Sequence, residues 1–305
     1  MGKYYYIVYG LTLESDYEFP QFVSIEKPEK AVDIEIEYGG ISDEVMEQVK
    51  NGYYSGHRYH DKWFRNKAGL FWIHDDRKIN FTEYDEGNVD DAAQYLPGMC
   101  LSILLWYRGM IMIHGACLRY KDKTVIIAGN SGSGKSTIST EFIKKGAKLI
   151  ADDVTGIGIE AGKYYSYPAF PAQKLCMDQI EKNGIDTRGL RQIRYDLNKF
   201  EIPRNQIFYN EKSSVDYLFR VESREKVLND FGLDFQAVDG AEKIKELTDV
   251  IFIRWMFHDA FRFEPEDLAR SIGFVNNLPM YKIVRERGKD TIRGIIDYIE
   301  SNITK

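Results

Sequence analysis

A single glycine-rich octapeptide carries the most direct chemical signal in this sequence of 305 residues. It begins at Gly129 and ends in Gly134-Lys135-Ser136, which is the spacing of a phosphate loop. The glycines let the backbone curl, so that successive N–H groups point inward and bind anionic oxygens. The lysine can reach the β- and γ-phosphates, and the serine hydroxyl can bind Mg²⁺. We therefore predict that this loop binds the phosphates of a nucleoside triphosphate.

The elements expected on either side of the loop support this prediction. An apolar strand over residues 124–128 leads into the loop, and a helix over residues 135–145 leaves it. The N-terminal end of that helix adds positive potential at the phosphates. A flexible Gly/Ser linker, the alternative explanation, would not lie between a strand and a helix. The predicted nucleotide-binding residues are Asn130, Ser131, Gly132, Ser133, Gly134, Lys135, Ser136 and Thr137.

Two adjacent carboxylates, Asp152 and Asp153, follow the next expected strand at residues 147–151. Carboxylates at a strand end beside a phosphate loop can hold Mg²⁺ or accept a proton. Neighbours on an extended chain point in opposite directions, so the two aspartates are expected to have different tasks. From spacing alone, a helix cap or an acidic turn explains them equally well. His114, on the strand before the loop, is by itself more typical of a satisfied core histidine.

The bulk composition excludes several classes of protein. The formal net charge of −6 gives no overall attraction to nucleic acid or to an anionic membrane. The three cysteines are sparse and lack metal-ligand spacing, which argues against a disulfide framework or a zinc site. No apolar run approaches the roughly 20 residues of a membrane span. We expect a cytoplasmic protein without nucleic-acid or membrane partners.

The distribution of strand and helix patterns predicts a mixed α/β fold in two domains. Residues 1–107 are expected to form a smaller β-rich domain that ends in a helix, and residues 108–305 a catalytic domain. Residues 178–210 are charged and show little periodicity. The expected strands are residues 4–13, 31–38, 70–74, 78–84, 110–120, 124–128, 147–151, 157–159, 163–167, 215–221 and 281–284. The expected helices are residues 90–107, with a kink at Pro97-Gly98, 135–145, 241–252, 265–275 and 289–301.

Several further polar residues allow both a functional and a structural explanation. Lys174, expected in a loop, is as compatible with a phosphate or substrate contact as with a solvated lysine. Arg254 lies in an apolar segment and needs a partner there, for which a structural salt bridge is favoured over a phosphate. His258 and Asp259 are interpreted as helix-end residues. Three arginines form a basic cluster, which is more typical of a solvated face than of a binding surface. They are Arg188, Arg191 and Arg194.

Three segments together resemble the catalytic core of the HPr kinase/phosphorylase family. They are residues 113–117 (IHGAC), 125–136 (the strand and phosphate loop) and 146–154 (GAKLIADDV), within a stretch of about 45 residues from Met110 to Thr155. The resemblance implies a kinase domain related to phosphoenolpyruvate carboxykinase, a mixed β core with a phosphate loop. It implies that Asp152 takes the proton from the acceptor hydroxyl, with Asp153 and His114 beside it and Lys135 on the phosphates. Mg²⁺ would be held by Ser136 and Asp153.

The same resemblance implies a Mg·ATP-dependent kinase that acts on a hydroxyl, most simply a serine of a peptide or protein. A small-molecule alcohol as acceptor, or a nucleotide-gated module without transfer, remain the alternatives. A later family signature is present only as a loose echo in Asp186-Thr187-Arg188-Gly189. The N-terminal part is more similar to divergent relatives from peptide-modification gene clusters, some of which phosphorylate a precursor peptide such as a lasso peptide. Homo-oligomerisation is left open.

Overall fold

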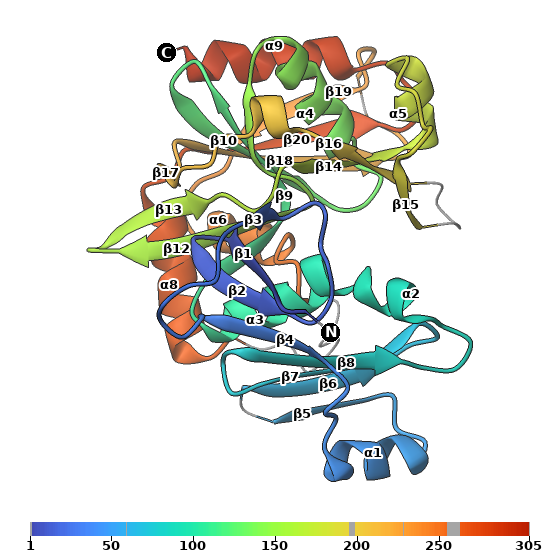
Figure 1. Cartoon of the computed structure of the whole chain (residues 1–305). Helices are drawn as coiled ribbons and strands as arrows, with labels where there is room; N and C mark the ends of the chain where they lie inside the picture. The colour runs from blue at the N-terminus through green and yellow to red at the C-terminus, as the bar shows by residue number, and fades with distance from the viewer. Residues whose placement is uncertain (1, 59, 195–198, 228, 255–262, 305) are drawn as a thin grey trace. The chain divides into compact units, whose positions relative to one another are not determined.

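The chain forms two compact units, residues 1–110 and residues 111–305. The computed structural model describes residues 2–58, 60–194, 199–227, 229–254 and 263–304, and Figure 1 traces them from the blue N-terminus to the red C-terminus. Each unit contains its own sheets, so each is considered separately.

The first unit is built on one mixed sheet. Among its described residues, eight strands follow the order β3-β1-β2-β4-β8-β7-β6-β5. Their bounds are β1 (Tyr4–Val8), β2 (Leu11–Ser15), β3 (Val23–Ser24), β4 (Ile34–Tyr38), β5 (Ser55–Arg58), β6 (Asp61–Arg65), β7 (Gly69–His74) and β8 (Lys78–Glu83). The alternation predicted in β4 is confirmed, because Ile34 and Ile36 are fully buried. The single strand expected over residues 4–13 is wrong: Tyr9 and Gly10 both have positive φ and turn the chain into a β1–β2 hairpin.

The helices of the first unit are short. Ser42 caps α1 (Asp43–Lys50) by accepting a hydrogen bond from the Val45 N–H. The long helix expected over residues 90–107 is divided into α2 (Val89–Ala93), a π-helical turn (Leu96–Cys100) and α3 (Leu101–Tyr107). Pro97 lies at the start of the π-helical turn, where its missing N–H breaks the helical hydrogen bonding.

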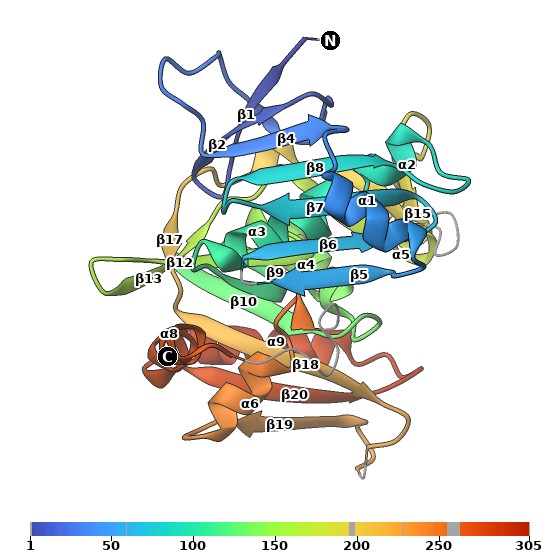
Figure 2. The ribbon, with the colours of Figure 1, turned by 90° about the horizontal axis from the view of Figure 1, so that it is seen from below.

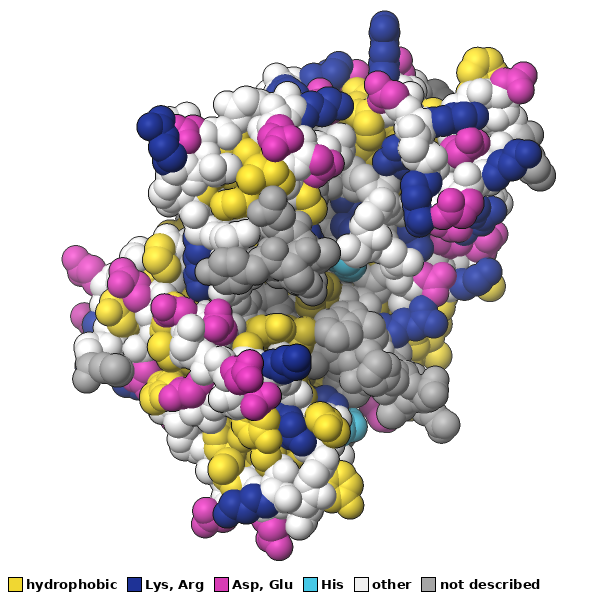
Figure 3. All heavy atoms as spheres, turned by 90° about the vertical axis from the view of Figure 1, so that its right-hand side faces the viewer, with side chains coloured by type: hydrophobic (Ala, Val, Ile, Leu, Met, Phe, Trp, Pro, Cys, Tyr) yellow, Lys and Arg dark blue, Asp and Glu magenta, His cyan; other side chains and the backbone are white. Residues whose placement is uncertain are grey.

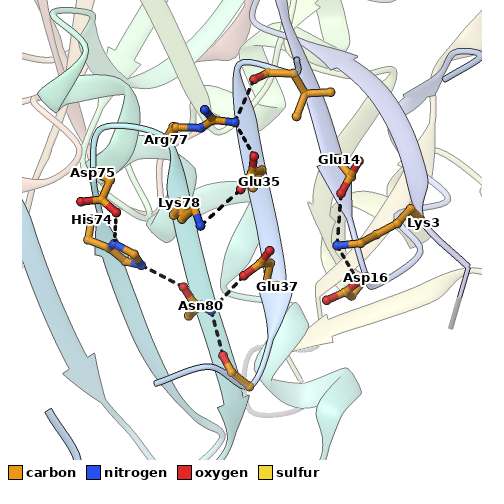
Figure 4. Close-up of polar contacts among 12 residues, drawn as sticks. Lys3, Glu14, Asp16, Glu35, Glu37, His74, Asp75, Arg77, Lys78 and Asn80 are labelled. Carbon is orange, nitrogen blue, oxygen red and sulfur yellow. Dashed lines mark hydrogen bonds and ion pairs between the residues drawn. The ribbon is translucent and has the colours of Figure 1, made fainter. Parts of the chain in front are cut away.

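Charged side chains of the first unit neutralise one another across the sheet (Figure 4). The Lys3 ammonium lies 3.1 Å from a Glu14 oxygen and 3.0 Å from an Asp16 oxygen. Glu35 pairs in the same way with Arg77 and Lys78. Such partly exposed pairs contribute about 0–1 kcal/mol each, so they are a weak source of stability.

The second unit contains a larger mixed sheet. Among the described residues it has the order β17-β13-β12-β9-β10-β18-β20-β19, with β11 also paired to β9. The pairs β10–β18 and β18–β20 are parallel, and the remaining pairs are antiparallel. The strands are β9 (Ile111–Tyr120), β10 (Lys123–Gly129), β11 (Lys148–Ala151), β12 (Val154–Glu160), β13 (Lys163–Tyr167), β17 (Ser213–Ser214), β18 (Tyr217–Arg224), β19 (Leu233–Ala237) and β20 (Met280–Glu286).

Helices cover both faces of this sheet, as Figure 2 shows from below. On one face, α4 (Lys135–Lys144) and α9 (Ile292–Ile303) pack on Ile127, Val221 and Ile283 in the main apolar core. On the other face, Lys282 of β20 pairs with Glu246 of α6 (Glu242–Thr248). Two further elements of this unit are α8 (Pro265–Asn276) and a short 3-10 turn at Asn205–Ile207.

Two of the three strands of a small third sheet lie within residues 178–210, the segment that lacked clear periodicity, and the third strand precedes it. The sheet has the order β14-β16-β15, with β14 (Ala172–Cys176), β15 (Arg191–Arg194) and β16 (Lys199–Pro203). It packs with α5 (Met177–Lys182) around Leu175, Ile180 and Ile202. The loop expected around Lys174 is therefore wrong. A strand of five residues with only two buried positions on its packed face, Gln173 and Leu175, offers too short a pattern to recognise.

Helix ends also differ from the sequence-based bounds. The helix expected over residues 241–252 stops at Thr248 in α6, and the closing helix begins at Ile292 rather than at residue 289. None of the helices in the described parts of the chain has both the length and the apolar character needed to cross a membrane.

Candidate functional site

The glycine-rich segment forms the predicted connection between a strand and a helix. It joins β10 to the N-terminus of α4, and Gly134 caps that helix with a φ of 102°. A side chain at Gly129 would lie 2.3 Å from the Val221 carbonyl oxygen, so only glycine fits there. At Gly134 an added Cβ would lie 2.8 Å from the Arg285 guanidinium. Close packing against backbone thus requires a glycine at Gly129, whereas Gly134 is favoured by its positive φ, because the arginine side chain near it could shift.

The lysine of the loop is held over its backbone. Lys135 Nζ donates to the Asn130 carbonyl oxygen at 2.9 Å, and the residue is only 9% exposed. Burial lowers the pKa of Lys135 to about 8, and Asp153 and Asp152 oppose that shift by attraction. Below that pKa the ammonium is charged, as a phosphate-binding group must be. The Ser133 hydroxyl beneath the loop is buried without a hydrogen-bond partner among the described residues.

Strand β9 brings His114 and the two aspartates together. β11 pairs with its C-terminal half, where Ala151 lies opposite Cys117, and β12 pairs with its N-terminal half, where Val154 lies opposite His114. The two aspartates form the link between β11 and β12. Asp153 has a φ of 65°, and its carbonyl accepts a hydrogen bond from the Gly115 N–H at 3.1 Å. This left-handed backbone is strained for a residue with a side chain, a feature that concentrates at functional sites.

Asp152 is a buried carboxylate with a raised pKa. It is 7% exposed, and its Oδ2 accepts a hydrogen bond from the Lys174 backbone N–H at 2.8 Å. Burial, reinforced by the neighbouring Asp153 charge, raises the pKa of Asp152 to about 6. A carboxylate of this pKa is mostly ionised at neutral pH and more basic than an ordinary aspartate. It is therefore suited to accept a proton.

Asp153 is firmly ionised, because a lysine holds it. Its Oδ2 lies 2.8 Å from Lys174 Nζ. Burial alone would raise the pKa of Asp153, but the Lys174 charge holds it well below the usual range. The same strand residue thus contacts both aspartates, one through its backbone and one through its ammonium. The two carboxylates consequently differ in protonation behaviour, although the left-handed backbone of Asp153 departs from the extended chain assumed in the sequence and both side chains contact Lys174.

His114 lies beside this pair as a neutral ring. Its Nε2 is 3.7 Å from Asp153 Oδ1, beyond hydrogen-bond distance, and its ring packs edge-on against Phe252. Burial and the Lys135 charge lower the pKa of His114 to about 4. The imidazole is uncharged at neutral pH, so it contributes a dipole rather than a second cation.

A buried glutamine connects the strand of Lys174 to the helix of the phosphate loop. Gln173 is fully buried, and its amide nitrogen donates to Ser139 Oγ and Thr140 Oγ1 of α4 at 3.0 and 3.2 Å. Its Oε1 accepts two hydrogen bonds from the Arg204 guanidinium. Because neighbours on a strand point to opposite sides, this anchor directs Lys174 toward the aspartates.

These groups line one pocket of about 470 Å³ in the second unit. Nine of the sequence-predicted residues are in its wall: His114, Ser131, Gly132, Gly134, Lys135, Ser136, Thr137, Asp152 and Asp153. Asn130 contributes its carbonyl to Lys135, and Ser133 lies beneath the loop. Ser136 and the aspartates supply the hard oxygen atoms that Mg²⁺ prefers, so the donor set fits that ion.

Several wall residues were not found from the sequence, and Arg285 is the most informative. It leaves β20, donates through Nε to Thr291 Oγ1 at 3.0 Å and through Nη2 to the Lys289 carbonyl at 3.1 Å. Its guanidinium lies over Gly134, and the Gly288-Lys289 turn beside it also lines the pocket. The only local sequence signal for Arg285 was the glycine turn that follows it, which lies between basic residues and precedes a helix. Such turns are common in loops of any function.

Other candidates do not reach the pocket. Asp186 and Arg188, the loose echo of the later signature, form an exposed ion pair with each other. Arg254 is exposed and pairs with Asp249, so the structural salt bridge favoured for it is confirmed although burial is not. The side chains of Arg194, His258 and Asp259 lie outside the described residues.

The second unit is thus a mixed α/β phosphate-loop domain with a carboxylate pair in the same pocket. Residues 108–186 match the family model described as HPr Serine kinase C-terminal domain. Over 88 residues the chain is 30% identical to an HPr kinase/phosphorylase from Mycoplasmopsis pulmonis (strain UAB CTIP), a match that covers 29% of this chain and 26% of that relative. These two matches confirm the resemblance to the HPr kinase-like superfamily that was seen in the sequence.

A solved structure is also similar. The HPr(Ser) kinase/phosphatase from Coxiella burnetii aligns with 63% of this chain and 90% of its own, at 13% sequence identity and a TM-score of 0.34. The sequence match spans only about a quarter of the length of the curated relative. The activity, substrates and partners of the whole protein are therefore proposed from the pocket itself.

Proposed function

We propose that this protein is a Mg·ATP-dependent kinase that transfers the γ-phosphoryl group to a hydroxyl, most simply a serine of a peptide or protein. The observation that carries the proposal is Asp152, a buried carboxylate with a pKa of about 6 in the same pocket as the phosphate loop. A loop alone supports nucleotide binding. A base of suitable pKa beside it supports transfer to a protic acceptor.

Each part of the pocket then has a task. The loop amides, Lys135 and Arg285 bind the phosphates, and Ser136 and Asp153 are the residues that would hold Mg²⁺. When bound, this ion would neutralise negative charge on the phosphates. Asp153 would use its Oδ1, since its Oδ2 holds Lys174.

The reaction follows from these positions. The acceptor O–H donates its proton to Asp152 as its oxygen bonds to the γ-phosphorus. The bond from that phosphorus to the β–γ bridging oxygen breaks, and ADP leaves with the electron pair. Lys135 remains on the phosphates throughout and stabilises the charge that develops on the leaving oxygen. Lys174 holds both carboxylates in place, one by its N–H and one by its ammonium.

The relatives named above carry HPr in their names, which makes a serine of such a protein one reasonable acceptor. A small alcohol remains an alternative acceptor. A nucleotide-gated module without transfer is the alternative function, and it would not need Asp152.

The test is transfer of labelled phosphate from ATP to serine peptides, HPr and small alcohols by the wild type and by Asp152→Asn. The asparagine can still accept the Lys174 N–H but cannot take a proton, so transfer should fall about 10³-fold while nucleotide affinity stays within about twofold. Lys135→Ala should reduce both. Unchanged transfer by Asp152→Asn would exclude it as the base. Nucleotide binding by the wild type without transfer to any acceptor would favour the gated module, and release of free phosphate alone would indicate an ATP hydrolase.

A further inference from the structure

The pocket has a second side, away from the phosphate loop, that the proposed reaction leaves for the acceptor. In transfer of a phosphoryl group the attacking and leaving oxygens lie roughly in line on either side of the phosphorus. The leaving oxygen belongs to the nucleotide on the loop. The acceptor therefore enters from beyond Asp152, where β14, β16 and α5 form the wall.

The small sheet turns one charged face toward this side. In the β14–β16 pairing Lys174 lies opposite Glu201, and Cys176 lies opposite Lys199. Opposite residues in an antiparallel pair project from the same face, and so do residues two apart on one strand. Lys199 is thus on the face from which Lys174 reaches Asp153, and both lysines line the pocket.

Two lysines on this wall form no ion pair among the described residues, although Asp178 lines the same pocket and the charge of Lys199 is felt at Asp153. Lys174 is neutralised by Asp153, but Lys199 and Lys182 form no ion pair there, although both line the pocket. Asp178 lies one helical turn before Lys182 on α5, yet it accepts its hydrogen bond from Gln179. Figure 3, which faces the side of α5 and β15, shows Lys and Arg side chains interspersed with Asp and Glu side chains on the upper part of this surface.

Lys199 is close enough to act on the reacting groups. Its charge lowers the pKa of Asp153, of His114 and of Lys135. The nucleotide side meanwhile has its own cations in Lys135, Arg285 and Lys289. Unpaired cations in a wall that a substrate covers lose hydration, and a matching anion compensates for that loss.

We infer that the acceptor carries a carboxylate beside its hydroxyl, and that Lys199 and Lys182 bind this carboxylate. The inference rests on the proposed function, because it names the chemistry of the substrate that Asp152 deprotonates. A serine flanked by acidic residues in a peptide and a free hydroxy acid both present this arrangement. The shared feature is an anionic oxygen within one side-chain length of the reacting oxygen.

Binding can be measured separately from transfer. Two matched pairs of probes are titrated into the full chain in the presence of Mg²⁺ and a non-transferable ATP analogue. One pair is a serine peptide flanked by aspartates and the same peptide flanked by asparagines. The other is N-acetyl-L-serine and N-acetyl-L-serinamide. The carboxylate member of at least one pair should bind about tenfold more tightly, which corresponds to one compensated charge contact.

The variants Lys199→Met and Lys182→Met assign that preference to residues. Either change should reduce the charge preference at least threefold while leaving affinity for the ATP analogue within about twofold. Lys163→Met, in an exposed lysine at the start of β13, is the matched control and should change neither. A preference confined to the peptide pair identifies an acidic peptide, and one confined to the small pair identifies a free hydroxy acid.

Other results would overturn the inference. Equal binding, or no binding, within both pairs shows that the wall does not select a carboxylate. Parallel loss of ATP-analogue affinity in Lys199→Met assigns that lysine to the nucleotide instead. A charge preference without labelled-phosphate transfer to any of the four probes contradicts the assignment of this carboxylate-binding wall to an acceptor. The proposed function fails only if the wider acceptor panel gives no transfer either.

Discussion

The sheet of the first unit and the pocket of the second unit differ in how their charged side chains are paired. In the first unit Lys3 and Glu35 each have two partners of opposite charge, and His74 is held at both ring nitrogens by Asp75 and Asn80 (Figure 4). In the second unit His114 Nε2 lies 3.7 Å from Asp153 Oδ1, beyond hydrogen-bond distance, and several lysines line one pocket. Charged side chains that pair with their neighbours stabilise the fold. Charged side chains that converge on a cavity remain available to bind a charged ligand.

The largest effect expected from this difference concerns two lysines with two carboxylate contacts each. Lys174→Met should reduce phosphoryl transfer about 100-fold, because Asp153 is left as an unpaired buried charge beside Asp152, although the backbone N–H that holds Asp152 is kept. Lys3→Met removes the pairs with Glu14 and Asp16 and should change stability by less than about 1 kcal/mol and transfer not at all. Transfer kinetics and thermal unfolding of both variants measure this contrast.

A structural effect of Lys174→Met must be separated from a catalytic one. The double variant Lys174→Met with Asp153→Asn removes both partners of the buried pair, so stability should return toward that of the wild type while transfer stays low. Wild-type transfer in either variant would show that this pair, like those of the first unit, serves structure alone.

A smaller effect is expected from two arginines on and just after β20. Arg285→Met should raise the KM for ATP about tenfold, since the guanidinium lies over the phosphate loop at Gly134. Arg287→Met is the matched control, because Arg287 is exposed and pairs with Glu225. Steady-state kinetics at varied ATP distinguish the two. Equal KM values would show that Arg285 serves structure alone, through its hydrogen bonds to Thr291 and the Lys289 carbonyl.

The smallest effect is a pH dependence of stability. The folded pKa of Asp152, about 6, lies above its ordinary value of 3.8, so the stability that protonation gives is present below pH 4 and lost as the pH rises through 6. Asp152→Asn removes this loss. The variant should therefore unfold at a higher temperature than the wild type at pH 8, and the difference should shrink below pH 4. Asp16→Asn in the first unit should show no such gain, and a pH-independent difference for Asp152→Asn would contradict the raised pKa.

The sequence predicted the strand, loop and helix of the phosphate-loop half of the pocket well, because that half is local. The loop, its strand and its helix are consecutive, and each is determined by short-range chemistry: glycine backbone freedom in the loop and apolar periodicity on either side. Ser136 and Lys135 follow from spacing. Asp152 and His114 lie within about 25 residues of the loop, and the family resemblance predicted that they share its site; β11 pairs with β9 in the sheet although β10 and α4 separate them in the chain.

The other half could not be predicted for the converse reason. Lys174 and Lys199 reach the pocket from a three-stranded sheet whose strands are four or five residues long, too short for a reliable pattern. Arg285 arrives from a strand about 150 residues after the phosphate loop, through a parallel pairing with β18. Such placements depend on long-range packing, which cannot be inferred from the local spacing of residues. The first unit shows the same limit at Tyr9-Gly10, where positive φ values turned one expected strand into two.

The Gln173 anchor has a consequence for how this protein can diverge. One short strand is tied on one side to α4 through Ser139 and Thr140, and on the other side to both aspartates through Lys174. A change in β14 would disturb the helix after the phosphate loop and both aspartates together, whereas Lys182 on α5 and Lys199 on β16 hold neither by a hydrogen bond or ion pair among the described residues. Descendants of this chain could therefore acquire new substrates by substitutions at Lys182 and Lys199 alone. An engineer seeking altered acceptor preference should randomise those two elements and leave β14 unchanged.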